Sequence, residues 1–97
     1  MRRAARQDDN HKEIREAARK MGCYWLDIFQ MKNCCDGILI KDGVCVAIEV
    51  KDGKKSPGRR MLTEGEQKFS IGWTAAGGKF AVIESVEQLQ ELIKGIT

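Results

Sequence analysis

Two short apolar runs on either side of Asp42-Gly43 form the clearest pattern of hydrophobic positions in the chain. Asp-Gly between such runs is a strong short-range signal for a two-residue turn, so residues 34–51 are predicted to form a β-hairpin. Both runs are apolar at successive positions, which is typical of strands that are covered on both faces. Cys45 lies between two valines of the second run and is therefore expected to be a small core residue.

A helical pattern precedes the hairpin. Apolar residues recur at helical spacing from Ile14 to Met21 and predict a helix that begins after Asn10 and ends at Gly22. Asn10 is followed three residues later by Glu13, which is the pattern of a capping box. This helix is therefore expected to start with its first backbone amides satisfied by side chains.

Strand and helix patterns also alternate in the rest of the chain. Thr63 and Glu66 form a second capping-box pattern, which predicts a helix to about residue 73 or 74. Two segments rich in aromatic and β-branched residues, 23–29 and 79–84, are predicted to be strands, and a short helix is expected from Ser85. The predicted order is α-β-β-β-α-β-α, which indicates a single α/β domain over residues 1–97.

Composition bears on cellular location and on zinc. No apolar run approaches the roughly 20 residues of a membrane-spanning helix, and polar residues follow Met1-Arg2-Arg3 where a signal peptide would be apolar. A cytoplasmic protein with reduced thiols is therefore expected. The four cysteines lack Cys-x-x-Cys spacing and His11 is the only histidine, which argues against a zinc site.

The predicted hairpin register brings charges together at its open end. If Asp42-Gly43 is the turn, Asp36 lies directly opposite Glu49, and Lys51 shares their face of the sheet. Two carboxylates about 5 Å apart repel each other by roughly 3 kcal/mol at an effective dielectric constant near 20. The hairpin end is either frayed and solvated, with Lys51 as counter-ion, or it binds a divalent cation through hard oxygen ligands. Charges at the end of otherwise apolar strands favour the cation.

At these residues the chain resembles a known family. Asp36-Gly37, a hairpin, and then Glu49-Val50-Lys51 look like the core of the PD-(D/E)XK nucleases. The later segment Leu62-Thr63-Glu64-Gly65-Glu66-Gln67 is similar to the helix motif, ending in glutamine, of the VRR-NUC branch, which includes small stand-alone phage and prophage proteins. The likeness spans about residues 10–89. It departs at Cys35, where the family usually has a proline before the aspartate.

The resemblance implies a fold, an activity and a metal site. The fold is a restriction-endonuclease-like core, with a mixed four-stranded sheet flanked by helices. The activity is that of a divalent-metal-dependent DNA endonuclease, a phosphodiester hydrolase. Mg²⁺ or Mn²⁺ would be held by Asp36, Glu49 and the Val50 carbonyl, and Lys51 would orient the attacking water or stabilise the charged transition state.

Two further residues are second-rank members of this implied site. Asn10 is either a helix cap alone or orients a water of the metal site, because the acid that the family often carries on its first helix has no clear counterpart here. Gln67 is either ordinary helix surface or contacts the substrate backbone and the catalytic waters.

Basic residues gather next to the predicted site. Lys54, Lys55, Arg59 and Arg60 follow the Glu-x-Lys strand in a loop that also contains glycine and the only proline, and they are predicted to bind nucleic acid. The formal net charge is +3, and residues 1–8 are expected to be a flexible basic arm that is either solvated or also binds DNA.

The resemblance leaves the biological setting open. It implies a homodimer acting on DNA, in some relatives on branched or four-way DNA, in a bacterial host cell or encoded by a phage. The alternative is a catalytically inactive nucleic-acid-binding module on a nuclease fold, favoured by the missing first-helix acid and by Cys35. An interaction protein without a nucleic-acid role is a third reading, and it predicts no salt-dependent DNA binding.

Neutralising the basic loop should weaken DNA binding and change its salt dependence. Phosphate contacts release counter-ions, so each one contributes to the slope of log affinity against log salt concentration. Replacing Lys54, Lys55, Arg59 and Arg60 together by glutamine should therefore lower affinity and flatten that slope on every DNA sequence. Fluorescence anisotropy over a salt series measures both effects, and an unchanged slope would place the DNA elsewhere on the protein.

Overall fold

The computed structural model describes residues 10–55, 58 and 61–96. Within these ranges it shows the predicted order of elements. They are α1 (His11–Lys20), β1 (Tyr24–Asp27), β2 (Gly37–Lys41), β3 (Val44–Val50), α2 (Glu64–Ala75), β4 (Lys79–Ile83) and α3 (Val86–Ile96). None of the described helices has the length and hydropathy that crossing a membrane requires.

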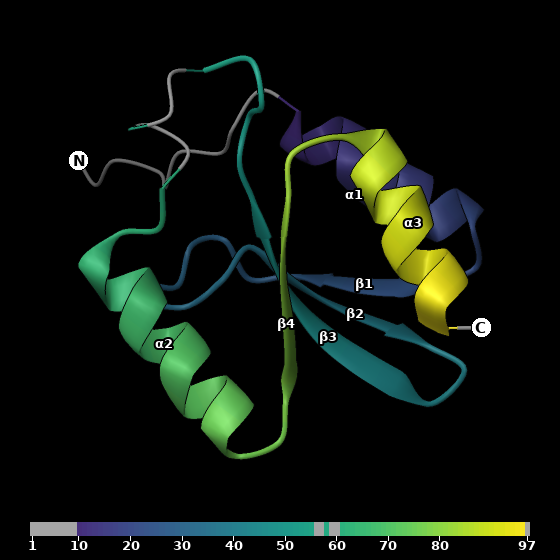
Figure 1. Cartoon of the computed structure of the whole chain (residues 1–97). Helices are drawn as coiled ribbons and strands as arrows, with labels where there is room; N and C mark the ends of the chain where they lie inside the picture. Colours follow the sequence, from purple (N-terminus) through teal and green to yellow (C-terminus); the bar gives the residue numbers. More distant parts are fainter. Residues whose placement is uncertain (1–9, 56–57, 59–60, 97) are drawn as a thin grey trace.

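The four strands form one mixed sheet in the order β1-β2-β3-β4 (Figure 1). The first three strands are antiparallel, whereas β4 runs parallel to β3 after the chain returns through α2. Asp42 and Gly43 both have positive φ angles, 52° and 80°, as a two-residue type I′ turn requires. Lys41 therefore pairs with Val44, which confirms the predicted hairpin register.

The main core lies between the sheet and the pair α1 and α3, while α2 lies on the other face (Figure 1). Trp25, Leu39 and Ile48 project from the sheet and are buried against apolar residues of the two helices, among them Ile14 and Leu89. This packing follows from the two periodicities of the sequence, because alternate strand residues meet the apolar stripes of α1 and α3.

Gly37, the first residue of β2, lies directly against the aromatic ring of Trp25. A Cβ atom at this position would be 2.4 Å from the ring of Trp25, so a side chain cannot be placed there without a shift. Asp27 is the strand partner of Gly37, and Asp36 immediately precedes it. The glycine thus lets a large core residue pack directly beside the open end of the hairpin.

The two predicted capping boxes have different outcomes. The box at α2 is present: the Glu66 amide donates to Thr63 Oγ1 (3.2 Å) and the Thr63 amide donates to Glu66 Oε1 (2.9 Å). The box at α1 was wrongly predicted, because Asn10 occupies the N-cap position but its side chain makes no capping hydrogen bond. That side chain is held instead by two distant carbonyl groups, which belong to the candidate site.

The prediction that the hairpin is covered on both faces is only half right. Helix α2 packs along β4, and the ring centroids of Phe69 and Phe80 are 6.2 Å apart. On this face of the sheet, α2 leaves the part formed by β1 and β2 uncovered. The residues there form what we call the bare face: Tyr24, Leu26, Ile38, Ile40 and Cys45. Tyr24, Leu26 and Ile40 are 64%, 47% and 41% exposed. Cys45 is exposed and is not the core residue that its valine neighbours suggested.

Candidate functional site

The candidate site lies where β2 begins and β3 ends. The Asp36 amide donates to the Ile48 carbonyl (2.9 Å), which continues the hairpin ladder by one residue beyond Gly37. The Val50 amide then donates to Asp36 Oδ2 (2.7 Å) and fixes that carboxylate in place. The register therefore places Asp36 opposite Glu49, as predicted from the turn.

Lys51 completes a compact group of charges with residues from two elements. Its Nζ lies 3.5 Å from Glu49 Oε2 and 3.1 Å from Glu66 Oε1 on the first turn of α2. Glu49 is only 3% exposed and Lys51 only 9%, so these charges are largely removed from water. Removing one partner from such a pair is costly, because the remaining charge is then buried without compensation.

A small cavity opens between these carboxylates. Asp36, Glu49 and Glu66 line it together with the segment from Phe29 to Cys35, and its volume is about 40 Å³. A cavity of roughly 10–15 Å³ on the same measure holds one water molecule. The space therefore suits a small ion with a water or two rather than an organic ligand.

The electrostatics of the group explain how three carboxylates stay together. Burial, and then the negative charges of Asp36 and Glu66, raise the pKa of Glu49 to about 10. Burial also raises the pKa of Asp36, against the hydrogen bond from Val50. Burial alone would lower the pKa of Lys51, but the hydrogen bond to Glu66 and the charge of Glu49 raise it. Without a cation, Glu49 therefore keeps its proton at neutral pH while Lys51 stays charged.

The donor atoms fit a hard divalent cation. Glu49 Oε1 is buried and has no hydrogen-bond partner among the described residues, so the site offers an oxygen atom that can bind a cation. In the described part of the chain no group of three or more His, Cys, Asp or Glu side chains is arranged to hold a metal ion by itself. Mg²⁺ does not need such a cage, because it is usually held by one or two carboxylates and keeps several waters. Burial, followed by the neighbouring Cys34, raises the pKa of Cys35 to about 12, which disfavours thiolate ligation.

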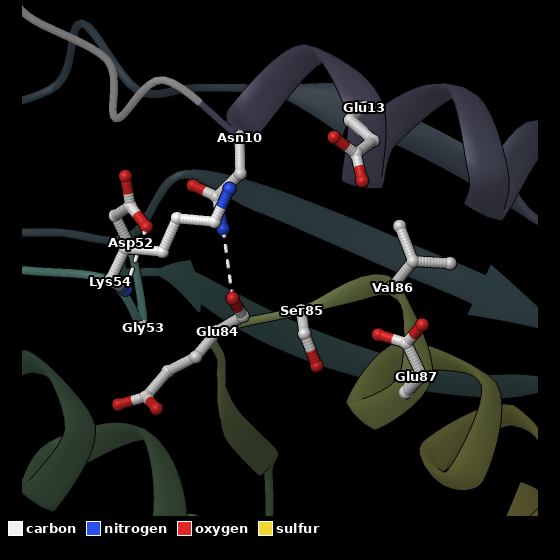
Figure 2. A pocket seen from close by; sticks show the side chains of 9 residues that line it. All are labelled: Asn10, Glu13, Asp52, Gly53, Lys54, Glu84, Ser85, Val86 and Glu87. Atoms are coloured by element: carbon white, nitrogen blue, oxygen red, sulfur yellow. Dashed lines mark hydrogen bonds between the residues drawn. The ribbon is translucent and has the colours of Figure 1, made fainter.

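Asn10 connects the two strand ends that flank the site. Its Nδ2 donates to the carbonyl oxygens of Lys51 (3.1 Å) and Glu84 (2.9 Å), and Figure 2 shows the second of these bonds. Its Oδ1 is buried without a partner. The first residue before α1 thus joins β3 and β4 behind Lys51, and the side chain braces the backbone of the site.

The cavity beside Asn10 does not extend the site for anions. Its volume is about 440 Å³, and the charged side chains that line it are those of Glu13, Asp52, Lys54, Glu84 and Glu87. Figure 2 shows the four carboxylates around the space, with Lys54 as the basic residue among them. A lining with four carboxylates and one ammonium group disfavours phosphate in this cavity.

The remaining predicted residues lie at the edge of the group. Gln67 is exposed, and its Nε2 donates to the Leu62 carbonyl (3.0 Å). Lys54 is exposed and Lys55 half-buried in the loop after β3, whereas Arg59 and Arg60 fall outside the described residues. The α2 side chain that enters the cavity is Glu66, which the sequence indicated only as a helix cap.

A second buried polar cluster, around Asp27 of β1, was not predicted from the sequence. His11 is fully buried, with Nε2 3.0 Å from Asp27 Oδ1, and Arg15 and Trp25 donate to the same carboxylate at 2.7 and 2.6 Å. Burial alone would raise the pKa of Asp27, but these three hydrogen bonds lower it. The only available signal was the position of His11, which shares the helical face of Ile14 and Ala18.

Replacing Glu49 by glutamine should stabilise the metal-free protein in a pH-dependent way. The folded-state pKa is about 10 and the ordinary value 4.5, so the folded protein binds an extra proton between these limits and loses stability as the pH rises through them. Glu49→Gln removes this loss. In chelator, its unfolding temperature relative to wild type should rise by on the order of 5 °C or more between pH 5 and pH 9.

Scanning calorimetry measures this difference, and the exposed Glu64→Gln is the matched control. A difference that is constant across the pH range would show that Glu49 is ionised in the folded protein.

Comparison with known proteins bears on the fold. No protein-family model matches the sequence, and no curated protein matches it either. A solved structure described as "VRR_NUC domain" superimposes with a TM-score of 0.67 at 17% sequence identity, over 93% of this chain and 100% of the other. The predicted restriction-endonuclease-like α/β core is confirmed. The likeness therefore shows that the chain has the fold of a VRR_NUC domain.

Proposed function

We propose that this protein is a divalent-metal-dependent endonuclease that hydrolyses phosphodiester bonds in DNA. One observation carries the proposal: half-buried Asp36 and buried Glu49 face each other at the end of a hairpin, with Lys51 beside them. A fold of the VRR_NUC type supports it, because the name of that structural neighbour denotes a nuclease. Two opposed carboxylates destabilise a sheet, whereas a divalent cation bound between them would compensate their charges.

Mg²⁺ or Mn²⁺ would be held by Asp36, Glu49 and the carbonyl oxygen of Val50. The chemistry that such a cation supplies is the activation of water and the screening of phosphate charge. Asp36 is prepared for this role because the Val50 amide fixes one carboxylate oxygen at 2.7 Å. Glu49 would contribute the buried oxygen Oε1, which has no hydrogen-bond partner within the described ranges of the chain.

Lys51 would act on the reacting phosphate. Its ammonium group stays protonated in the site, so it serves as an electrostatic stabiliser or as the group that orients the attacking water, and not as a general base. Asn10 would hold the backbone at Lys51 in place, because its side-chain amide donates a hydrogen bond to the Lys51 carbonyl oxygen. Gln67, which is exposed near the start of α2, would contact the substrate backbone.

DNA is the proposed partner, and branched or four-way DNA the proposed preferred form. The basic loop follows Lys51 directly in the sequence. Its exposed Lys54 would contact phosphates. A site of this kind in a bacterial or phage-encoded protein of the cytoplasm has direct access to such DNA.

A second copy of the chain is the proposed occupant of the bare face. Tyr24, Leu26 and Ile40 place three large, exposed apolar side chains on neighbouring strands, next to Ile38 and Cys45. Apolar patches of this kind mark interaction sites in soluble proteins. A patch that is apolar throughout can pair with its own copy about a two-fold axis, and two linked sites suit a substrate with several DNA strands.

Cleavage assays on linear, nicked and four-way DNA test the function. Asp36→Ala, Glu49→Ala and Lys51→Ala should each lower the metal-dependent rate by about 100-fold or more, because each removes a cation ligand or the stabilising charge. Asn10→Ala and Gln67→Ala should have smaller effects. Circular dichroism establishes that each variant folds.

Turnover by Glu49→Ala at the wild-type rate, in preparations free of host nuclease, would contradict the assignment. If the folded wild type binds DNA but cleaves none of the three substrates with Mg²⁺ or Mn²⁺, the protein is instead a binding module on a nuclease fold.

Placing a charge on the bare face should dissociate the proposed dimer. Ile40→Glu would bury an unpaired carboxylate in the interface, at a cost of several kcal/mol, so sedimentation velocity should show monomers where the wild type gives dimers. Ile71→Glu is the matched control, since Ile71 is 66% exposed on α2 and lies outside the bare face. A monomeric wild type, or equal behaviour of the two variants, would refute this interface.

A further inference from the structure

Glu66 is the side chain through which α2 reaches the site. Its Oε1 accepts hydrogen bonds from the Thr63 amide (2.9 Å) and from Lys51 Nζ (3.1 Å). Because the same oxygen belongs to the capping box, the position of this carboxylate is set by the first turn of the helix. Its side chain is 20% exposed and lines the cavity with Asp36 and Glu49.

We propose that Glu66 is a positioning residue that holds the Lys51 ammonium in place for cleavage, so that the start of α2 becomes part of the catalytic site. The inference rests on the proposed nuclease function. A lysine side chain has many accessible rotamers, so its ammonium group is poorly placed unless fixed contacts hold it. Glu66 provides the shorter of the two contacts that Lys51 makes with carboxylates, 3.1 Å against 3.5 Å to Glu49.

The three carboxylates have different proposed roles, and this difference supports a positioning role for Glu66. Asp36 and Glu49 are the proposed cation ligands, and an oxygen of Glu49 that binds a cation is a weaker partner for a neighbouring ammonium. Glu66 is then the anion that still balances Lys51. When ionised, three carboxylates and one ammonium sum to a charge of −2, which one divalent cation neutralises.

The neighbouring Gln67 does not make these contacts. One residue further along a helix points about 100° away, and the Gln67 amide group binds the Leu62 carbonyl on the exposed side of the turn. Within the helix motif, the residue that touches Lys51 is therefore Glu66.

The variant Glu66→Gln tests the inference without disturbing the helix. Glutamine at this position preserves a capping box, so the start of α2 keeps its hydrogen bonds while the negative charge is lost. The maximal cleavage rate should fall about 10-fold or more, whereas KM for DNA and the unfolding temperature in chelator should not worsen. Glu64→Gln is the matched control, because Glu64 is 88% exposed in its side chain and pairs only loosely with Lys68 at 4.0 Å.

A double-mutant cycle shows whether Glu66 acts through Lys51. In the Lys51→Ala background, Glu66→Gln should have no further effect on the residual rate, because the group that it positions is gone. An additional 10-fold loss in that background would overturn the positioning role.

Chemical labelling gives a readout that does not depend on cleavage. Acetic anhydride modifies free amines, and mass spectrometry can compare Lys51 with the exposed Lys54 in the metal-free protein. Lys51 should react slowly in wild type and Glu64→Gln, and several-fold faster in Glu66→Gln. Wild-type labelling together with a wild-type rate in Glu66→Gln would refute the inference. Absence of metal-dependent cleavage by the wild type would refute the proposed function instead, while the labelling would still decide whether Glu66 holds Lys51.

Discussion

The candidate site depends on the hairpin register that the Asp42-Gly43 turn imposes. With two residues at positive φ, the turn leaves Lys41 paired with Val44, and every following pair is determined by that start. A slip of one residue would reverse the facing of a whole strand and separate Asp36 from Glu49. Asp36 and Glu49 repel each other when both are ionised and so do not stabilise this register. The register is held instead by the turn and by the apolar pairs between the turn and the two acidic residues. Favourable interactions at the turn end of the hairpin thus maintain an unfavourable arrangement of charges at the open end. Functional sites are commonly stabilised in this way by the surrounding structure.

The parts of the fold that were predictable from the sequence are those fixed by local rules. Turn chemistry identified the hairpin, alternation and helical spacing identified the elements in their correct order, and the Thr63–Glu66 box located the start of α2. The same rules placed Asp36, Glu49 and Lys51 together, since their proximity follows from counting residues outward from a turn. The roles of these residues as ligands and catalyst do not follow from counting, and they remain proposals.

The parts that sequence reasoning missed depend on contacts between distant segments. Asn10 has the local pattern of a helix cap, but two carbonyl groups far along the chain offer its amide better partners. Cys45 has the neighbours of a core residue, but α2 packs along β4 and does not reach it. Glu66 was recognised as a cap, and only the folding of α2 beside β3 shows that the same oxygen also binds Lys51. In each case tertiary geometry added a partner to a residue whose local role was already plausible.

The bond pattern of Asn10 has a consequence for the order of folding. Its two hydrogen bonds span 41 and 74 residues, so they join the beginning of the described chain to its middle and to a point close to its end. Contacts of such long range form late, because the entropy of closing large loops must be overcome first. During synthesis, α1 and the hairpin can form before Glu84 leaves the ribosome, but the backbone behind Lys51 cannot yet be joined to β4. The complete site therefore forms only after the chain has been synthesised beyond Glu84. Shorter nascent chains contain Asp36, Glu49 and Lys51 without the Asn10 bond that joins the backbone at Lys51 to β4.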